Sequence, residues 1–578
     1  MRRPLAAALV FLLLAPLARA DQLAPEAATG IGTATLVRAE RQMAVTANPL
    51  ASEAAAAILA AGGSAADAAI AALLVLGLVE PQSSGLGGGA FWLQFDAGGA
   101  RLHAYDGRET APASATPDWF LGPDGAPVDF MAAVKSGRSV GVPGFVALLW
   151  LAHERHGRLP WAELFEPAIA LAEGGFAVSP RLAALLAGDE VVPANPEAAR
   201  FFLDAQGQPP AAGAWLVNPG YAAVLRRLAA EGPAAFYQGA VAEAVVAAAN
   251  QGEATPTLTL ADLAGYQAKE RQVVCLAYRA YEVCGHGPPT SGGVSVLQIL
   301  GVLGNFALPG PAQAPADLHL LAEASRLAFA DRNAYLADPD FVPQPVAQLL
   351  DPAYLRQRAA LVRPDAILGP AEPGLPLKQG RLGDGLGGPS TTHLVVVDRW
   401  GDAVSITASI ESAFGSGRLV SLPGLAGGFL LNNELTDFAF RPADETGVAV
   451  ANRVEPGKRP RSSMAPVIVL DADGRVAFAL GSPGGSRIIG FVAQALVALI
   501  DWDLDPAEAV ALPHVLNRNG KTELELGRGL EDTGVALTAL GHTVIEAEMS
   551  SGLAIVKVTP AGLEGAADPR REGTALGE

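Results

Sequence analysis

The chain of 578 residues is rich in apolar side chains (50%) and poor in charged ones (17%). This composition excludes an intrinsically disordered protein, because such chains cannot bury enough apolar surface to offset their conformational entropy. The 40 basic and 59 acidic residues give a formal net charge of −19. A chain this acidic repels phosphate backbones and anionic membranes, and no basic patch stands out, so small molecules rather than nucleic acids are the expected partners.

The first twenty residues have the pattern of an export signal. Arg2 and Arg3 precede an apolar run over residues 5–17, and Ala18 and Ala20 have the spacing of a cleavage site. The run is too short for a membrane helix, which needs about 20 apolar residues. We predict a signal peptide over residues 1–20 and an exported protein, periplasmic or extracellular, with no membrane span.

Two consecutive helices are predicted between residues 48 and 80. Asn48 is a favourable N-cap and is followed by Pro49, which suits the first helical position. Ser64 and Asp67 have the spacing of a capping box for a second helix. That helix is apolar on every side, which indicates that it is fully buried.

Three short motifs match known sites, and the surrounding sequence argues against each of them. Residues 85–90 fit a dinucleotide-binding fingerprint, but the expected helix precedes this segment and the strand follows it, which is the reverse of the required order. Ser139 lies in a Gly-x-Ser-x-Gly sequence without a buried strand leading into it. His153 and His156 are three residues apart, whereas a zinc helix needs four. We expect no metal and no cofactor.

The two cysteines, Cys275 and Cys284, flank a predicted hairpin that turns at residues 279–280. Directly opposed positions and an exported chain permit a disulfide, although the cross-strand geometry is demanding. Two buried thiols are the alternative, and the sequence does not distinguish between them.

The composition changes between residues 364 and 390, where Gly and Pro accumulate without an apolar period, as is typical of a flexible linker. Strands are predicted directly afterwards, over residues 391–398 and 403–410. Helices grouped before the linker and paired strands after it favour an α+β fold in which helices cover layered sheets.

The linker ends at Ser390, and Thr391 stands at the head of a strand. A hydroxyl at this place suits cleavage of the chain between the two residues, which would free the α-amine of Thr391. That amine has an ordinary pKa of about 7.7 to 8.0 and could act as the base for its own hydroxyl. A Ser/Thr cluster at a strand edge is the plainer interpretation, and spacing alone favours it.

Nine sequence blocks, taken in chain order, favour cleavage over the plainer interpretation. They are the stretch over residues 48–92, and then YDGRETAP, VGVPGFVALL, PPTSGGV, AFADRNAYLADPDF, STTHLVVVD, FLLNNELTDF, GKRPRSSMAP and GSPGGSRI. Together they resemble the γ-glutamyltranspeptidase family over nearly the whole mature chain. The resemblance implies the N-terminal-nucleophile hydrolase fold, a four-layer αββα sandwich built jointly from two chains of one autocleaved precursor. The large subunit would be 21–390 and the small subunit 391–578.

The resemblance also implies a role for each matching residue. Thr391 would be the nucleophile, with Ser409 hydrogen-bonded to it and the backbone N–H groups of Gly484 and Gly485 forming the oxyanion hole. The substrate α-carboxylate would be bound by Arg108, Ser462 and Ser463. Its α-ammonium would be bound by Glu411, Glu434 and Asp437.

These roles predict a cofactor-independent enzyme that transfers a γ-glutamyl group from glutathione to water or to an amino-acid or peptide acceptor. Glu411 and Glu434 depart from the pattern, because some members carry Asn and Gln there. Residues 439–461 are shorter than the family's lid over the pocket, which would admit bulky donors. Two alternatives remain: a glutaryl or cephalosporin-type acylase on the same fold, and an unprocessed binding protein without catalytic activity.

Overall fold

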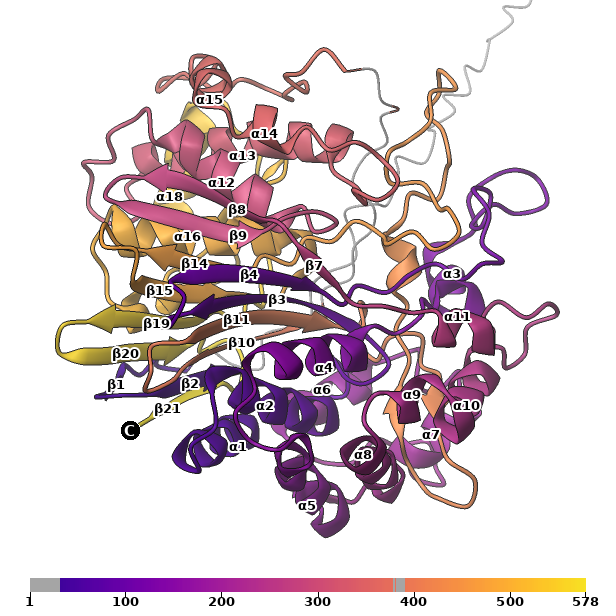
Figure 1. Ribbon diagram of the computed structural model, residues 1–578. Helices are drawn as coiled ribbons and strands as arrows, with labels where there is room; N and C mark the ends of the chain where they lie inside the picture. The colour runs from indigo at the N-terminus through magenta and orange to yellow at the C-terminus, as the bar shows by residue number, and fades with distance from the viewer. Residues whose placement is uncertain (1–31, 378–379, 381–389) are drawn as a thin grey trace, which may run out of the picture.

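The computed structural model describes residues 32–377, 380 and 390–578 of the chain. The expected signal peptide and the second half of the linker up to residue 389 therefore lie outside the described residues, apart from Gly380. Two large sheets pack face to face, and helices cover the outer face of each, so the molecule has the four layers of the expected αββα sandwich (Figure 1). Within the described ranges, no helix combines the length and apolar character that crossing a membrane requires.

The first sheet carries the segment that begins at the linker. Its seven strands are, in spatial order, β21 (Thr574–Gly577), β2 (Met43–Thr46), β10 (Thr392–Val397), β11 (Ala403–Ser409), β3 (Gly89–Asp96), β4 (Arg101–Asp106) and β7 (Lys269–Arg271). All neighbours are antiparallel, and the predicted hairpin of β10 and β11 pairs Thr392 with Ala408. Strands from after the linker thus lie between strands from before it.

The second sheet mixes the two halves of the chain in the same way. Its strands are, in spatial order, β1 (Val37–Ala39), β20 (Gly562–Ala567), β19 (Ala554–Thr559), β15 (Val476–Gly481), β14 (Val467–Leu470), β9 (Tyr281–His286) and β8 (Val273–Tyr278). Small sheets are formed by β5 (Phe176–Ala177) with β6 (Trp215–Leu216), by β12 (Leu419–Val420) with β13 (Phe429–Leu430), and by β16 (Val515–Asn517), β17 (Thr522–Glu525) and β18 (Val544–Ala547).

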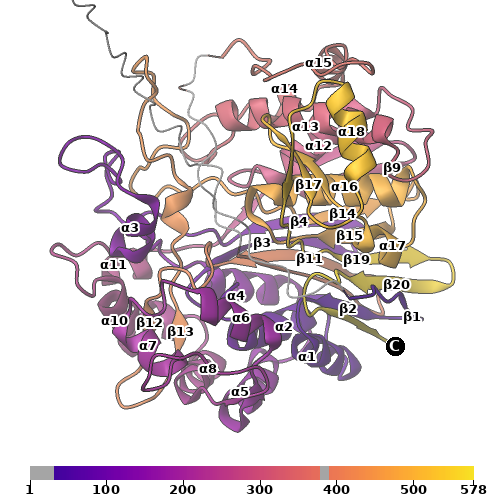
Figure 2. The same cartoon turned by 180° about the vertical axis from the view of Figure 1, so that it is seen from behind.

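The helices separate by layer (Figures 1 and 2). The first sheet is covered by α1 (Pro49–Ala60), α2 (Ala65–Val79) and α4 (Phe145–His156), and the second by α12 (Gly292–Leu303), α16 (Ile488–Ile500) and α17 (Pro506–Ala511), with α13 (Pro315–Tyr335) packed on α12. The remaining helices are α3 (Phe130–Lys135), α5 (Glu166–Gly174), α6 (Pro180–Gly188), α7 (Pro196–Phe202), α8 (Pro219–Glu231), α9 (Ala234–Tyr237), α10 (Gly239–Ala249), α11 (Leu260–Ala264), α14 (Val346–Leu349), α15 (Pro352–Ala359) and α18 (Glu531–Ala539).

Helix α2 packs against the two strands that lead into the candidate site, β10 and β11. Its predicted capping box is present, because Ser64 and Asp67 exchange side-chain and backbone hydrogen bonds. Every residue of α2 is buried, and the helix packs on β10 and β11. Its last turn leads into residues 80–84, which contact the segment just before β10.

Two of the motifs that the sequence analysis set aside have structural roles. Ser139 lies in a single 3-10 turn, where its hydroxyl donates to the backbone carbonyls of Val134 and Ser136. His153 lies in the last turn of α4, and its Nε2 is 2.9 Å from the carbonyl oxygen of Leu159. Neither residue reaches the candidate site described below.

Two other features bear on the sequence predictions. Cys275 and Cys284 lie opposite each other on β8 and β9 and form a disulfide.

The first part of the linker differs from the flexible segment that was predicted, because its backbone is hydrogen-bonded to the body of the protein. Ile367 donates to the carbonyl of Leu540, and Gly374 donates to the Asp331 carboxylate of α13. A Gly- and Pro-rich composition does not reveal such contacts.

Candidate active site

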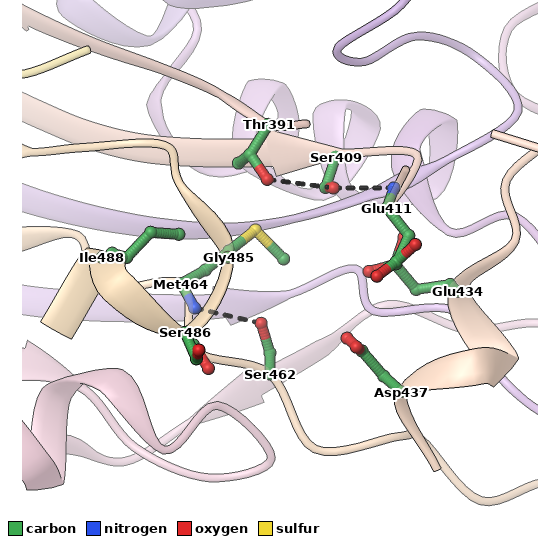
Figure 3. Close-up of a pocket in the computed structure, with 11 residues that line it drawn as sticks. Thr391, Ser409, Glu411, Glu434, Asp437, Ser462, Met464, Gly485, Ser486 and Ile488 are labelled. Atoms are coloured by element: carbon green, nitrogen blue, oxygen red, sulfur yellow. Dashed lines mark hydrogen bonds between the residues drawn. The ribbon is translucent and has the colours of Figure 1, made fainter. Parts of the chain in front are cut away.

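A small pocket, with a cavity volume of about 30 Å³, opens where β10 and β11 approach the start of α16 (Figure 3). It is lined by Thr391, Ser409, Glu411, Glu434, Asp437, Ser462, Ser463, Met464, Gly485, Ser486 and Ile488. Eight of these were named from the sequence. Met464, Ser486 and Ile488 were not singled out, although each lies within a quoted block. None of the described residues between 439 and 461, the proposed short lid, lines the pocket.

Thr391 lies at the inner end of the pocket, one residue before β10, and it is almost fully buried. Its Oγ1 is 3.3 Å from the Oγ of Ser409, the last residue of β11. The Ser409 oxygen accepts a hydrogen bond from the backbone N–H of Glu411 at 2.8 Å. Its own proton is therefore available for Thr391 or for the preceding carbonyl group.

Ser390 is held firmly against this pair. Its N–H donates to the carbonyl of Glu411, and its hydroxyl donates to the carbonyl of Gln82 in the loop after α2. The Ser409 hydroxyl donates to the Ser390 carbonyl oxygen at 3.0 Å. One hydroxyl group thus contacts both the Thr391 oxygen and the carbonyl group of the bond that precedes Thr391.

Arg571 also contacts Thr391, and the sequence analysis did not identify it. Its Nη1 donates to the Thr391 carbonyl oxygen at 2.7 Å, and the side chain is buried. The contact joins residues 180 positions apart, so no local pattern in the sequence could have indicated it.

Gly484 and Gly485 form the turn between β15 and α16. Their φ values of 130° and 60° are conformations that favour glycine, and a Cβ atom on Gly484 would lie 2.7 Å from the Phe491 ring. The turn leads into the N-terminal end of α16, where unpaired N–H groups favour negative charge. The position suits stabilisation of an oxyanion, although close packing alone would also require glycine.

Arg108 is buried behind the pocket wall instead of lining it. Its guanidinium pairs with Glu434 through Nη1 and with Asp437 through Nη2, and it also donates to the carbonyls of Pro460 and Arg461. The groups that the resemblance assigns to the α-carboxylate and to the α-ammonium of a substrate therefore contact each other. A ligand carboxylate can reach Arg108 only if Glu434 or Asp437 turns away.

The carboxylates around Arg108 have perturbed ionisation. Burial raises the pKa of Glu434 to about 7, although Arg108 opposes the shift. Burial and the nearby Glu434 raise the pKa of Glu109 well above its ordinary value. The sequence analysis did not single out Glu109, which follows Arg108 in the same block. The cluster around Arg108 therefore holds part of its acid groups protonated near neutral pH.

The two serines at the far wall have different partners. Ser462 accepts a hydrogen bond from the backbone N–H of Met464 at 3.1 Å. Ser463 accepts one from Nη2 of Arg332, a buried residue of α13, at 2.6 Å. A serine that accepts from a guanidinium keeps its own proton for a ligand oxygen. Arg332 lies in a block quoted above, but its part in the site was not predicted.

Glu411 has an unusual backbone conformation, with a φ of 78°. Its carboxylate accepts hydrogen bonds from Ser412 and Asn433 and lines the same pocket as Glu434 (Figure 3). Left-handed backbone is tolerated better by Asn than by other side chains, which gives a physical reason for the Asn that the resemblance places there.

The pocket residues described above do not include a set of three candidate ligands close enough together to hold a metal ion. Among the described residues, one set of three candidate ligands lies close enough to hold an ion, namely Cys275, Glu282 and Cys284. The two sulfur atoms are joined in the disulfide and are not thiolates. The pocket itself offers hydroxyl groups, carboxylates and backbone N–H groups, which is the chemistry of acyl transfer to a hydroxyl.

Comparison with known proteins agrees with this chemistry. Residues 51–578 match the family model described as Gamma-glutamyltranspeptidase. The chain is 37% identical to a glutathione hydrolase proenzyme of Escherichia coli (strain K12) over 92% of this chain and 91% of the relative. It is 38% identical to the acylase ACY 1 proenzyme of Pseudomonas sp. (strain SE83), with 93% of each chain covered. Its structure is similar to that of a cephalosporin acylase from Bacillus halodurans, with a TM-score of 0.81, 27% identity, and coverage of 94% of this chain and 97% of that one.

Proposed function

The chain belongs to the γ-glutamyltranspeptidase family, and from this premise we propose that it is a self-processing glutathione hydrolase and γ-glutamyltransferase. It cleaves its own backbone between Ser390 and Thr391 and then uses Thr391 to accept γ-glutamyl groups. The observation that carries the proposal is the position of Ser409, whose hydroxyl contacts both the Thr391 oxygen and the Ser390 carbonyl.

Cleavage begins when the Thr391 hydroxyl attacks the carbonyl carbon of Ser390. Negative charge develops on the Ser390 carbonyl oxygen, which the Ser409 proton stabilises. The C–N bond then breaks, the Thr391 nitrogen takes up the proton that the Thr391 hydroxyl loses, and an ester links Ser390 to the Thr391 side chain. Hydrolysis by water releases the Ser390 carboxylate and leaves Thr391 as a new N-terminus.

In the mature enzyme the α-amine of Thr391 takes the proton of its own hydroxyl during attack on the γ-amide carbon of the donor. The amine of the departing fragment receives that proton, and the γ-glutamyl group remains as an ester. N–H groups of Gly484 and Gly485 would bind the oxyanion of each step. Water or an acceptor amine then takes the group and restores Thr391.

Substrate recognition follows from the charges at the other end of the pocket. Ser462, Ser463 and Arg108 suit a carboxylate, and Glu411, Glu434 and Asp437 suit an ammonium group. An amino acid carries both groups on one carbon atom. Because Arg108 already pairs with Glu434 and Asp437, an α-amino acid can replace each half of these ion pairs with the matching charge.

Electrophoresis under denaturing conditions tests the processing step. Purified protein should give two bands, and the smaller should begin with Thr391. Thr391→Ala should give one uncut chain, and Thr391→Ser, which keeps a hydroxyl, should still be cut. A single band from active wild-type protein would refute the proposal, and cleavage of Thr391→Ala would move the nucleophile to another residue.

An acylase is the second candidate, because relatives and structural neighbours of nearly the same length carry that name. Glutaryl amides have the distal carboxylate of a γ-glutamyl group but lack its ammonium. Hydrolysis of γ-glutamyl and glutaryl anilides therefore separates the two activities. We expect Asp437→Asn to lower kcat/KM for the γ-glutamyl anilide about 10- to 100-fold and to leave the glutaryl anilide nearly unchanged. Faster glutaryl turnover by the wild type would favour the acylase.

The proposed function includes export, division into two subunits and binding of small-molecule substrates. Residues 1–20 would direct export to the periplasm or the extracellular space and be removed. Residues 21–390 and 391–578 would form the large and small subunits, which are each other's partners in the mature enzyme. The expected small-molecule partners are glutathione or other γ-glutamyl amides and an amino-acid or peptide acceptor.

A further inference from the structure

We propose that Arg332 is a positioning residue that determines specificity: it fixes the Ser463 hydroxyl as a hydrogen-bond donor, so that the pocket selects a carboxylate over a carboxamide at the α-carbon of the substrate. The inference rests on the proposed function and deepens it, because it concerns the wall that would hold the α-carboxylate. Arg332 is not among the residues that line the pocket, and it acts through Ser463.

Arg332 reaches the pocket wall from the helices that cover the second sheet. It lies in the last turn of α13 and is buried. Its Nη2 donates to the Ser463 Oγ at 2.6 Å, and its Nε donates to the Ser291 Oγ at 2.9 Å. Its Nη1 donates to the Asn333 side chain at 2.7 Å. The planar guanidinium has several donors in a rigid fork, so it holds these groups in one fixed arrangement.

Ser291 connects this arrangement to the backbone of the pocket serines. It is the N-cap of α12, and both its N–H and its hydroxyl donate to the Ser462 carbonyl oxygen, at 2.8 and 2.6 Å. The Ser462 N–H donates to the Pro289 carbonyl at 3.2 Å. The backbone at this wall is therefore fixed from α12, and Arg332 sets the direction of the Ser463 side chain that projects from it.

These contacts decide what the two serines offer a ligand. A hydroxyl group has one proton and two lone pairs, and a guanidinium has donors but no acceptor. The Ser463 oxygen accepts from Arg332, so its own proton must point elsewhere. The Ser462 oxygen accepts from the Met464 N–H in the same way. Both serines line the pocket, where each can donate its proton to a ligand oxygen.

Two hydroxyl donors suit a carboxylate better than a carboxamide. A carboxylate only accepts hydrogen bonds, and its two oxygens can accept one from each serine. Hydrogen bonds to a charged acceptor are also the stronger ones. A carboxamide has one oxygen, and its NH₂ group would face a hydroxyl that is fixed as a donor. The mismatch leaves a buried polar group without a partner, which lowers affinity for the carboxamide.

Without Arg332, the Ser463 hydroxyl can rotate and accept from the NH₂ group, so the discrimination should weaken. The test uses two substrates, the γ-glutamyl anilide and its analogue with a carboxamide in place of the α-carboxylate. The readout is the ratio of their kcat/KM values at one pH, which does not depend on the fraction of active protein. We expect the wild type to prefer the carboxylate and Arg332→Met to lower this ratio about tenfold.

Arg326→Met is the matched control. Arg326 is a buried arginine of the same helix, but its contacts are with Glu323 and the Gly520 carbonyl. Neither of these groups lines the pocket. Arg326→Met should therefore keep the wild-type ratio, whatever its effect on stability.

A double-mutant cycle shows whether Arg332 acts through Ser463. Ser463→Ala removes the hydroxyl group that Arg332 holds. In that background, Arg332→Met should change the ratio by less than about twofold, because the two substitutions then remove the same interaction. A full tenfold effect in the absence of the hydroxyl would overturn the inference, since Arg332 would act by another route.

The other outcomes are also decisive. A wild-type ratio in Arg332→Met, or a wild type that does not prefer the carboxylate, would overturn the inference and leave the proposed function intact. A wild type that does not turn over the γ-glutamyl anilide would refute the proposed function itself. If Arg332→Met does not mature, Arg332→Gln carries the same prediction, because its side chain is polar but too short to replace the contact with Ser463. Failure of both variants to mature would assign Arg332 a role in folding alone and overturn the inference.

Discussion

Ser409 is the residue on which the proposed cleavage depends most directly. It donates to the Ser390 carbonyl, contacts the Thr391 hydroxyl and is held by the Glu411 N–H. Removing one donor to a developing oxyanion slows acyl transfer by about 10²- to 10³-fold. We therefore expect Ser409→Ala to slow the appearance of the two subunits to a similar extent in a time course of denaturing gels.

Ser405 provides the matched control for Ser409 on the same strand. It is also buried, and its hydroxyl donates to the Leu480 carbonyl of β15 and accepts from the Val467 N–H of β14. Ser405→Ala should lower the free energy of unfolding by about 1–3 kcal/mol through these lost contacts. Its precursor should be cut at the wild-type rate. Equal rates for the two variants would remove Ser409 from the cleavage step.

At the residue scale, what could be predicted from the sequence depended on how far apart in the chain the interacting residues lie. The caps at Asn48 and Ser64 are local, and both are present as expected. The resemblance named eight of the residues that line the pocket, because short blocks carry them. The contacts made by Arg571 and Arg332 join segments more than a hundred residues apart. Their partners are set by the packing of whole layers, which no window of sequence displays.

Helix α2 shows the same limit at the scale of an element. Its apolar sequence predicts burial, but not that Glu80 follows its last turn inside the protein with no exposed surface. Burial raises the pKa of this carboxyl from 4.5 to about 8. The folded state therefore binds more protons than the unfolded chain between these values, and the stabilisation present at low pH is lost as the pH rises through this window.

Replacing Glu80 should remove this pH dependence. Between pH 5 and 8 the group lowers the free energy of unfolding by up to about 1.4 kcal/mol per pH unit. Urea titrations at the two pH values should show a smaller difference for Glu80→Gln than for its parent. Glu53→Gln, at an exposed position of α1, is the control. All variants would carry Thr391→Ala so that each is a single chain, and an unchanged slope in Glu80→Gln would contradict the assignment.

At the scale of the whole molecule, the two proposed subunits are interleaved. In the first sheet β10 and β11 lie between β2 and β3, and in the second β14 lies beside β9 while β20 lies beside β1. Every large sheet therefore has strands from both sides of residue 390. Neither segment can complete a sheet or bury its core alone, so cleavage should create two chains without creating two domains.

This arrangement predicts how the cleaved protein comes apart. The two subunits should elute together in size-exclusion chromatography and separate only in denaturant. Because unfolding then also dissociates the chains, a tenfold dilution should lower the apparent free energy of unfolding by about 1.4 kcal/mol, and the midpoint should fall with it. The uncut Thr391→Ala precursor, with the same strands in one chain, should have a midpoint independent of concentration. A small subunit that elutes alone in native buffer, or a cleaved protein whose midpoint ignores dilution, would contradict the interleaved assembly.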